Sequence, residues 1–209
     1  MRRSFALAVA VFTGLMTGAC ADGSGENQVT GPGGTTSGVR TLMDVTDGLD
    51  VTTGQVGTFN WAGQSFVVSE SGTFGDLRFN FYSYQKRPVA FGNLYLLTQE
   101  YLGVPGVLSS STPGFVARAA SNADGVYAFA DSAVVTGGTK YWVYTDAQGS
   151  FAGSFDTDIY TGGDLYLTGF PTNPFRKAPA SGRMVNGVLV PAPPGVFLDA
   201  NFRLQARGR

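Results

Sequence analysis

The strongest constraint on the fold of this chain is an alternation of apolar and polar side chains with a period of two residues. The clearest case is segment 77–82, LRFNFY, in which a leucine and two phenylalanines alternate with more polar residues. This period is typical of a β-strand with one buried and one solvent-facing side. Other segments with strand character are 64–68, 94–97, 126–129, 141–144 and 200–204. We find no convincing amphipathic helix, so the pattern predicts an all-β domain from about residue 40 onward.

Turn residues separate these segments. The chain contains 30 glycines and 10 prolines, which favour tight turns between short strands. Gly137-Gly138 joins two strand-like runs and is predicted to form a hairpin turn with positive φ. Asn186-Gly187, between Met184-Val185 and the run 188–190, is a stronger hairpin signal. Short strands at regular spacing predict a β-sandwich.

Composition excludes several classes of function. The 209 residues include 14 Lys and Arg against 15 Asp and Glu, so the basic excess of a nucleic-acid-binding domain is missing. The chain has no histidine, which removes the commonest general base, the commonest metal ligand and the Ser/His and Cys/His catalytic pairs. The length suits one domain with appendages.

The N-terminus has the features of an export signal. A basic start at 1–4 precedes an apolar run at 5–16, which is too short to span a bilayer, since spanning takes about 20 residues. The run leads into Thr17-Gly18-Ala19 and then Cys20, the only cysteine of the chain. This stretch resembles the lipobox of bacterial lipoproteins, where small residues precede the cysteine that becomes lipidated, with Thr17 in the place of the common leucine. The alternative is an ordinary signal peptide followed by an incidental cysteine.

The resemblance implies that residues 1–19 are removed and that Cys20 becomes an acylated N-terminus. Several acyl chains on one residue would anchor the protein stably to a membrane. The segment that follows is rich in Gly, Ser and Thr and holds almost nothing large or apolar, which predicts a flexible tether. The expected organisation is a signal peptide at 1–19, a lipidated tether at 20–39 and a β-sandwich domain at 40–209. This places the domain in the cell envelope, on the periplasmic side or at the cell surface.

Five landmark segments follow one another along the β domain, at 63–66, 72–74, 137–142, 158–163 and 198–203. Their sequences are GQSF, GTF, GGTKYW, DIYTGG and LDANFR. The stretch from about residue 55 to 206 resembles the jelly-roll, galactose-binding-like modules of secreted and surface-anchored bacterial proteins. The resemblance implies an antiparallel β-sandwich of jelly-roll type and favours a role in binding glycans.

The stretch 169–195 departs from this pattern. It is long and proline-rich, and it carries Arg176, Lys177 and Arg183. Proline cannot donate to a central ladder, so the stretch is predicted to lie at a sheet edge or to stand off the sandwich. It is either a solvated loop with a small hairpin or an arm that docks on a partner.

Only oxygen ligands are available for a metal, and these suit calcium. One group of aspartates lies at Asp44, Asp47 and Asp50, and a second surrounds the turn at 161–163; neither has EF-hand spacing. A structural calcium is one interpretation of the second group, and no other cofactor is expected. The aspartates that could take part are Asp156, Asp158, Asp164 and Asp199. In the other interpretation, these aspartates stabilise turns by accepting hydrogen bonds from nearby backbone amides.

No motif typical of an enzyme is present. The chain has no Gly-x-Ser-x-Gly elbow, phosphate-binding glycine loop or dinucleotide fingerprint. Glycoside hydrolysis needs two carboxylates about 5–10 Å apart, but fifteen acidic residues permit such a pair in almost any fold. We therefore expect a protein that is not an enzyme.

Aromatic side chains are the remaining candidates for binding. Five of them lie on or beside strands at positions whose neighbours are expected to face the core: Tyr82, Tyr84, Tyr95, Trp142 and Tyr144. An exposed row of such rings could stack on sugars or pack against a protein partner. Alternatively, these rings only pair with one another across strands.

Together these features predict a lipid-anchored, extracytoplasmic domain that binds and does not catalyse. In the first hypothesis it is an accessory subunit of an envelope protein complex, which docks through the outer aromatics and the 169–195 arm. In the second hypothesis it is a carbohydrate-binding module for surface or environmental glycan. Both hypotheses include the membrane as a partner through the lipid anchor, and neither includes nucleic acid.

Overall fold

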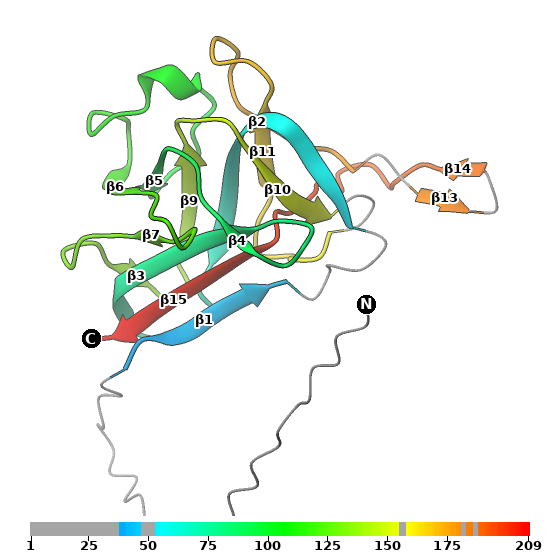
Figure 1. Ribbon diagram of the computed structural model, residues 1–209. Helices are drawn as coiled ribbons and strands as arrows, with labels where there is room; N and C mark the ends of the chain where they lie inside the picture. The colour runs from blue at the N-terminus through cyan, green and yellow to red at the C-terminus, as the bar shows by residue number, and fades with distance from the viewer. Residues whose placement is uncertain (1–37, 47–52, 155–157, 181–182, 186–187) are drawn as a thin grey trace, which may run out of the picture. The chain divides into compact units, whose positions relative to one another are not determined.

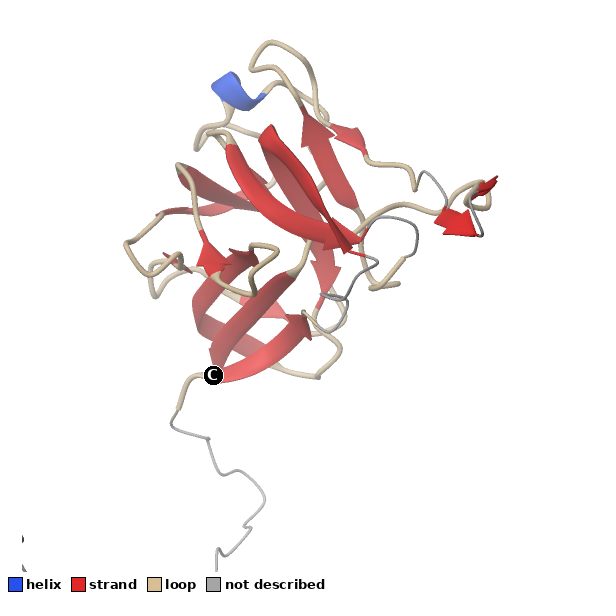
Figure 2. Ribbon diagram, turned by 45° about the vertical axis from the view of Figure 1, so that its right-hand side comes forward, coloured by secondary structure: helices blue, strands red, loops and turns tan. Residues whose placement is uncertain are grey.

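Two antiparallel β-sheets pack face to face as a sandwich, which confirms the predicted fold class (Figure 1). The computed structural model describes residues 38–46, 53–154, 158–180, 183–185 and 188–209. All of these lie in one compact unit, Thr35–Arg209. The described part contains a single 3-10 helix, η1 (Pro105–Val107), and otherwise strands and loops (Figure 2). Within it, no helix has the length and apolar character needed to cross a membrane.

Sheet I is built around the long strand β3. One side of β3 pairs with β15, which in turn pairs with β1, and the other side pairs with three short strands. The strands are β1 (Arg40–Val45), β15 (Phe202–Gly208), β3 (Thr73–Tyr82), β4 (Pro88–Val89), β7 (Tyr127–Ala128) and β8 (Val135–Thr136).

Sheet II is built around the longest strand, β2. The second half of β2 lies between β9 and β11, and its first half pairs with β10. In spatial order the strands are β12 (Arg176–Lys177), β11 (Leu165–Thr168), β2 (Thr53–Val67), β9 (Lys140–Thr145), β5 (Asn93–Leu97) and β6 (Phe115–Ala120), with β10 (Gly149–Ser154) beside β2. A separate ribbon pairs β13 (Arg183–Val185) with β14 (Val188–Val190).

The chain alternates between the two sheets in the manner of a jelly roll. It places β1 in sheet I, β2 in sheet II, β3 in sheet I, β5 and β6 in sheet II, β7 and β8 in sheet I, β9 in sheet II and β15 in sheet I. The spatial order β1-β15-β3 with the short strands, opposite β2-β9-β5-β6, is the double Greek key of this architecture. Strands β11 and β12 extend sheet II beyond β2.

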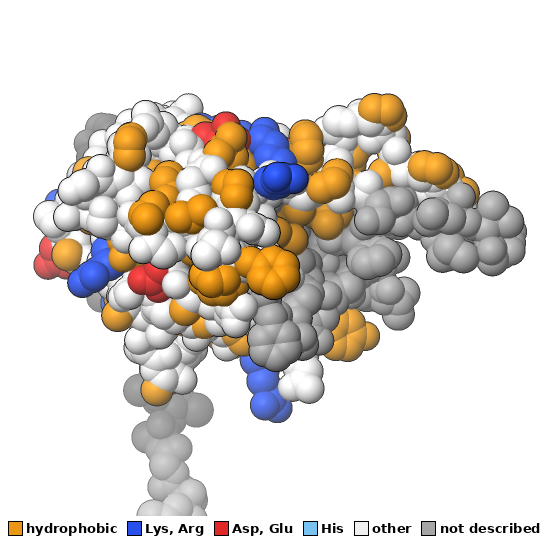
Figure 3. Space-filling view, turned by 90° about the horizontal axis from the view of Figure 1, so that it is seen from above, with side chains coloured by type: hydrophobic (Ala, Val, Ile, Leu, Met, Phe, Trp, Pro, Cys, Tyr) orange, Lys and Arg blue, Asp and Glu red, His pale blue; other side chains and the backbone are white. Residues whose placement is uncertain are grey.

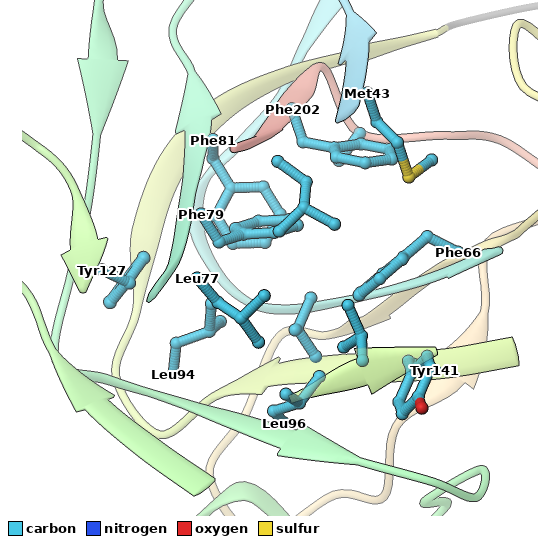
Figure 4. Packing of buried hydrophobic residues seen from close by; sticks show 14 of the residues in the cluster. Met43, Phe66, Leu77, Phe79, Phe81, Leu94, Leu96, Tyr127, Tyr141 and Phe202 are labelled. Carbon is cyan, nitrogen blue, oxygen red and sulfur yellow. The ribbon is translucent and has the colours of Figure 1, made fainter. Parts of the chain in front are cut away.

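The core lies between the sheets and is rich in phenylalanine (Figure 4). The rings of Phe79 on β3 and Phe202 on β15 stack with centroids 5.3 Å apart and an interplanar angle of 11°. Burying one such side chain stabilises the folded state by about 1.5–3 kcal/mol. Other fully buried members are Phe66, Leu77, Phe81, Leu94 and Leu96. Since the only cysteine is Cys20, no disulfide supplements this core.

The prediction that one side of segment 77–82 faces solvent is wrong for the last residues of the segment. Arg78 is exposed, but Asn80 and Tyr82 are only 3% and 6% exposed. The outer side of β3 is covered there because Ala152 packs against Tyr82 and the guanidinium of Arg203 lies 5.4 Å from the centre of the Tyr82 ring. Alternation therefore identified the core side correctly but not the exposure of the opposite side.

The two predicted hairpin turns have different outcomes. Val185 pairs with Val188, which confirms the hairpin around 186–187, two residues outside the described part. Gly138 has the predicted positive φ of 77°, but no hairpin forms there, because β8 pairs with β3 while β9 pairs with β2. The turn instead carries the chain from sheet I to sheet II. A Cβ atom at Gly137 would lie 1.8 Å from the carbonyl oxygen of Glu70, so this crossing needs a glycine.

The stretch 169–195 begins as part of sheet II. Strand β12 pairs with β11, and beyond it the Ala178 amide donates to the Leu165 carbonyl (2.9 Å). The Leu198 amide donates in turn to the Ala178 carbonyl (2.8 Å). The first half of the stretch is therefore an edge of the sandwich. Strands β13 and β14 pair only with each other, and Figure 1 draws them to the side of both sheets.

Candidate functional site

A row of side chains crosses five strands on the outer face of sheet II, the face turned away from the core. The strand register places Tyr166 of β11, Gly63 of β2, Tyr144 of β9, Tyr95 of β5 and Arg118 of β6 side by side. We call this set the outer row. A Cβ at Gly63 would lie 2.4 Å from the Tyr144 ring, so the glycine leaves space for Tyr144 and Tyr166, whose ring centroids are 5.5 Å apart.

On these strands, the residues that alternate with the outer aromatics face the core, as the sequence predicted. The strand neighbours expected to face the core do so, and all of them belong to the main cluster: Phe81, Leu94, Leu96, Tyr141 and Val143. Three of the predicted aromatics, Tyr95, Trp142 and Tyr144, therefore share the outer face of sheet II and form a second cluster.

Two loops, 98–114 and 169–175, cover most of the outer row. The ring of Phe175 lies 4.9 Å from that of Tyr144, and the ring of Tyr101 lies 5.7 Å from it on an edge. The Phe175 amide donates to the Gly103 carbonyl (3.0 Å), which joins the two loops. As a result Tyr144 is buried, and the outer aromatics are not the exposed row that stacking on a ligand would require.

Hydrogen bonds hold the phenols of this cluster in place. The Tyr101 amide donates to the Tyr144 hydroxyl (3.1 Å), and the Tyr166 hydroxyl donates to Glu100 Oε1 (2.6 Å). Trp142 Nε1 donates to the Tyr166 hydroxyl (3.2 Å). Burial raises the pKa of both Tyr144 and Tyr166 well above the usual value for tyrosine, because it disfavours the charged phenolate. Both hydroxyls are thus neutral groups that are hydrogen-bonded within the cluster.

The outer row opens to solvent at its β5–β6 end, where a pocket of about 510 Å³ lies. Its lining residues come from β5, β6 and the loop between them: Tyr95, Leu108, Ser109, Ser110, Phe115 and Arg118. The rings of Tyr95 and Phe115 meet edge to face with centroids 6.4 Å apart. Arg118 is exposed and has neither an ion pair nor a side-chain hydrogen bond among the described residues.

Apolar walls with a few convergent polar groups are the usual composition of a small-ligand site. Of the lining residues, only Tyr95 was predicted from the sequence. The signal for Arg118 is the alternation in β6, where Ala117 and Ala119 are buried and Arg118 points outward. That pattern predicts that Arg118 points outward. It does not predict that Arg118 lies beside Tyr95, because the two paired strands are separated by a long loop.

The remaining predicted aromatic and basic residues lie elsewhere. Tyr82 is buried beside Arg203, and Tyr84 is 57% exposed in the turn between β3 and β4. Arg176 is exposed on β12. Lys177 binds Asp164 (2.9 Å) and lies 5.1 Å from the centre of the Phe197 ring. The side chain of Arg183 and the whole of Cys20 lie outside the described residues.

The three predicted calcium ligands that the structure describes do not gather at one point. Asp156 lies outside the described residues, and Asp164 lies between Lys177 (2.9 Å) and Lys140 (3.8 Å). Asp158 and Asp199 do come together, because the carboxyl groups of both accept from the Tyr160 amide (3.0 and 3.1 Å). Among the described residues, no group of three or more acidic side chains could hold a metal. In the other aspartate group, Asp44 binds Arg203, and Asp47 and Asp50 are not described.

Asp199 is fully buried, and its carboxyl group is hydrogen-bonded to Gln64 of β2 and to the backbone at Tyr160. Its carboxyl accepts from Gln64 Nε2 (3.0 Å) and from the Tyr160 amide (3.1 Å), while Gln64 Oε1 accepts from the Ala200 amide (2.8 Å). Burial is the main cause that raises the pKa of Asp199 to about 8, and the neighbouring Asp158 raises it further. The bonds from Gln64 and Tyr160 act in the opposite direction.

Asp199 is expected to make the domain less stable as the pH rises. Between the ordinary value of 3.8 and about 8, the folded protein holds a proton that the unfolded chain releases. The stabilisation is fully present below that range and is lost as pH rises through the folded pKa, at up to about 1.4 kcal/mol per pH unit. Melting temperatures measured from pH 5 to 9 should therefore fall.

Asp199→Asn carries no titrating proton and should flatten this pH profile. Asp124→Asn, an exposed aspartate in the turn after Asn122, is the matched control and should leave the slope unchanged. A wild-type melting temperature that is constant over the range would contradict the assignment.

The pocket at the β5–β6 end of the outer row is thus where the described residues combine a hollow, aromatic rings and an unpaired charge. Its groups suit reversible binding of a small ligand. A scan against protein-family models, a search of curated proteins and a search of solved structures each find no match to this chain.

Proposed function

We propose that this chain is a lipid-anchored extracytoplasmic binding domain that is not an enzyme. Support for the anchor is the sequence alone, with Cys20 directly after a short apolar run and small residues. Support for binding is the pocket beside Tyr95 and Phe115, which carries the proposal.

The proposed ligand of this pocket is a glycan. The pocket volume of about 510 Å³ falls within the range of small-molecule sites. Phe115 is half-buried, so part of its ring remains available to the apolar face of a sugar. The hydroxyls of Ser109 and Ser110 supply donors and acceptors for sugar hydroxyls.

The lining residues also support binding over hydrolysis. Glycoside hydrolysis uses two carboxyl groups, one of which acts as an acid and the other as a base or nucleophile. None of the six residues that line the pocket carries a carboxyl group.

A second candidate function is docking on an envelope protein complex as an accessory subunit. Its support is three hydrophobic side chains at the surface of the two joined loops: Leu102, Val107 and Phe170, with exposed fractions of 53%, 61% and 65%. Figure 3, a view from above, shows hydrophobic side chains gathered among uncharged polar atoms, with few charged groups. Aromatic and aliphatic side chains of this kind are typical of protein interfaces.

Replacing the proposed lipidation site should release the protein from the membrane. Cys20→Ala removes the thiol that would carry the acyl chains, so the variant should move from the membrane fraction to the soluble fraction. Mass spectrometry of the wild-type N-terminus should show an acylated cysteine. A wild-type protein with an unmodified Cys20 would contradict the anchor.

Glycan binding should depend on the ring of Phe115. Phe115→Leu keeps apolar volume but removes the aromatic face, so retention in gels containing neutral or acidic polysaccharides should weaken about three- to tenfold. Phe170→Leu, which changes an exposed ring outside the pocket, is the matched control and should be retained like the wild type. Failure of every polysaccharide to retard the wild-type protein would reject the glycan candidate.

Docking should depend on the exposed loop residues instead. The double variant Leu102→Ser and Phe170→Ser should lose any membrane proteins that co-purify with the wild type in fixed stoichiometry, at an unchanged melting temperature. Tyr84→Ser removes an equally exposed ring on a distant turn and should keep them. Retention of the same partners by the double variant would reject this surface.

A further inference from the structure

The feature of the pocket that glycan binding in general does not explain is Arg118. Its guanidinium is exposed at the pocket, and no partner for it exists among the residues that the structure describes. Most other cations of the described part are engaged: Arg40 binds Glu70, Arg203 binds Asp44, and Lys140 and Lys177 both bind Asp164.

The pocket holds no negative charge of its own to balance Arg118. None of its lining residues is acidic. The nearest carboxylate that an interaction links to the lining is that of Asp146, which accepts from the Tyr95 hydroxyl (3.4 Å) and does not itself line the pocket. Both oxygens of that carboxylate are bound by Asn93, from its amide nitrogen and from its side chain, at 2.7 Å each. An anionic group of a ligand could therefore pair with Arg118 without competition from a carboxylate of the lining.

We propose that the pocket selects sugars that carry a carboxylate, with Arg118 binding the carboxylate and Phe115 packing against the sugar ring. A guanidinium presents its N–H groups in a planar fork that matches a carboxylate with two parallel hydrogen bonds. Ser109 and Ser110, which also line the pocket, hydrogen-bond the ring hydroxyls. The proposal rests on the glycan function argued above and names the class of sugar.

Pairing between β5 and β6 sets the positions of Arg118 and Phe115. Arg118 is directly opposite Tyr95, and Phe115 is opposite Leu97, so both ligand-facing residues of β6 are held against buried residues of β5. Tyr95 is itself paired with Tyr144 in the middle of the covered outer row. The backbone of β6 at Arg118 and Phe115 is therefore positioned by its pairing with β5, with one irregularity of register between Leu96 and Leu97.

The test compares two forms of one oligosaccharide by calorimetry on the full, lipidated chain in mild detergent. The probes are a galacturonate trimer and the same trimer after reduction of its carboxyl groups to alcohols. The wild type should bind the acidic trimer at least about tenfold more tightly than the reduced one. Arg118→Gln should lower affinity for the acidic trimer to that for the reduced trimer, and Arg118→Lys, which keeps the charge but not the fork, should lie between.

Arg87→Gln, an exposed arginine in the turn before β4, is the matched control and should bind like the wild type. Because Arg118 is exposed and unpaired, Arg118→Gln should keep the wild-type melting temperature. Equal affinity of the wild type for both trimers would overturn the selection of acidic sugars and leave glycan binding intact. Binding of other polysaccharides but of neither trimer would also overturn it, whereas failure to bind any polysaccharide would reject the glycan function itself.

Discussion

The structure depends on the burial of sheet II on both of its faces. Its inner face packs against sheet I, and its outer face packs against the loops 98–114 and 169–175. Strands in such a sheet need large apolar or aromatic side chains at successive positions, which NLYLL in β5 and KYWVYT in β9 provide. The pocket lies at β6, the last strand of the sheet, where Leu108, Ser109 and Ser110 of the covering loop line it and leave Arg118 and part of Phe115 accessible.

Much of the fold could be predicted from local pattern. Alternation located parts of β2, β3, β5, β7, β9 and β15 and predicted the sandwich class, because the direction of a side chain follows from its position along a strand. It did not locate β1, β6, β10 or β11. Exposure could not be predicted in the same way. Tyr82 and Tyr144 both point away from the core and are nevertheless buried, since segments far away in the sequence cover them. Gly138 likewise has the conformation that its sequence favours, but the partners of the adjoining strands are set by the whole topology.

In the candidate site, too, the direction of side chains could be predicted, whereas contacts between distant segments could not. Of the five aromatics predicted as one row, Tyr95, Trp142 and Tyr144 share the outer face of sheet II, because all three lie on outward positions of neighbouring strands. Tyr82 and Tyr84 do not lie on this sheet. Arg118 was not included, since its place beside Tyr95 depends on how β6 pairs after the loop that contains η1. Gln64 and Asp199, whose side chains meet across a separation of 135 residues, were beyond the reach of any short-range pattern for the same reason.

The position of β1 determines how the domain responds to mechanical load. A pull transmitted through the N-terminal segment enters the fold at Arg40, where β1, the outermost strand of sheet I, pairs with Ala206. Because β1 and β15 are antiparallel, a pull between the N-terminal segment and the C-terminus loads the Arg40–Ala206 end of the ladder first, near the Arg40–Glu70 ion pair. The partner strand β15 is held on its other side by β3 and the stacked core rings. Tension between the two termini would therefore separate β1, which pairs with β15 alone, before it strained the sandwich that carries the pocket.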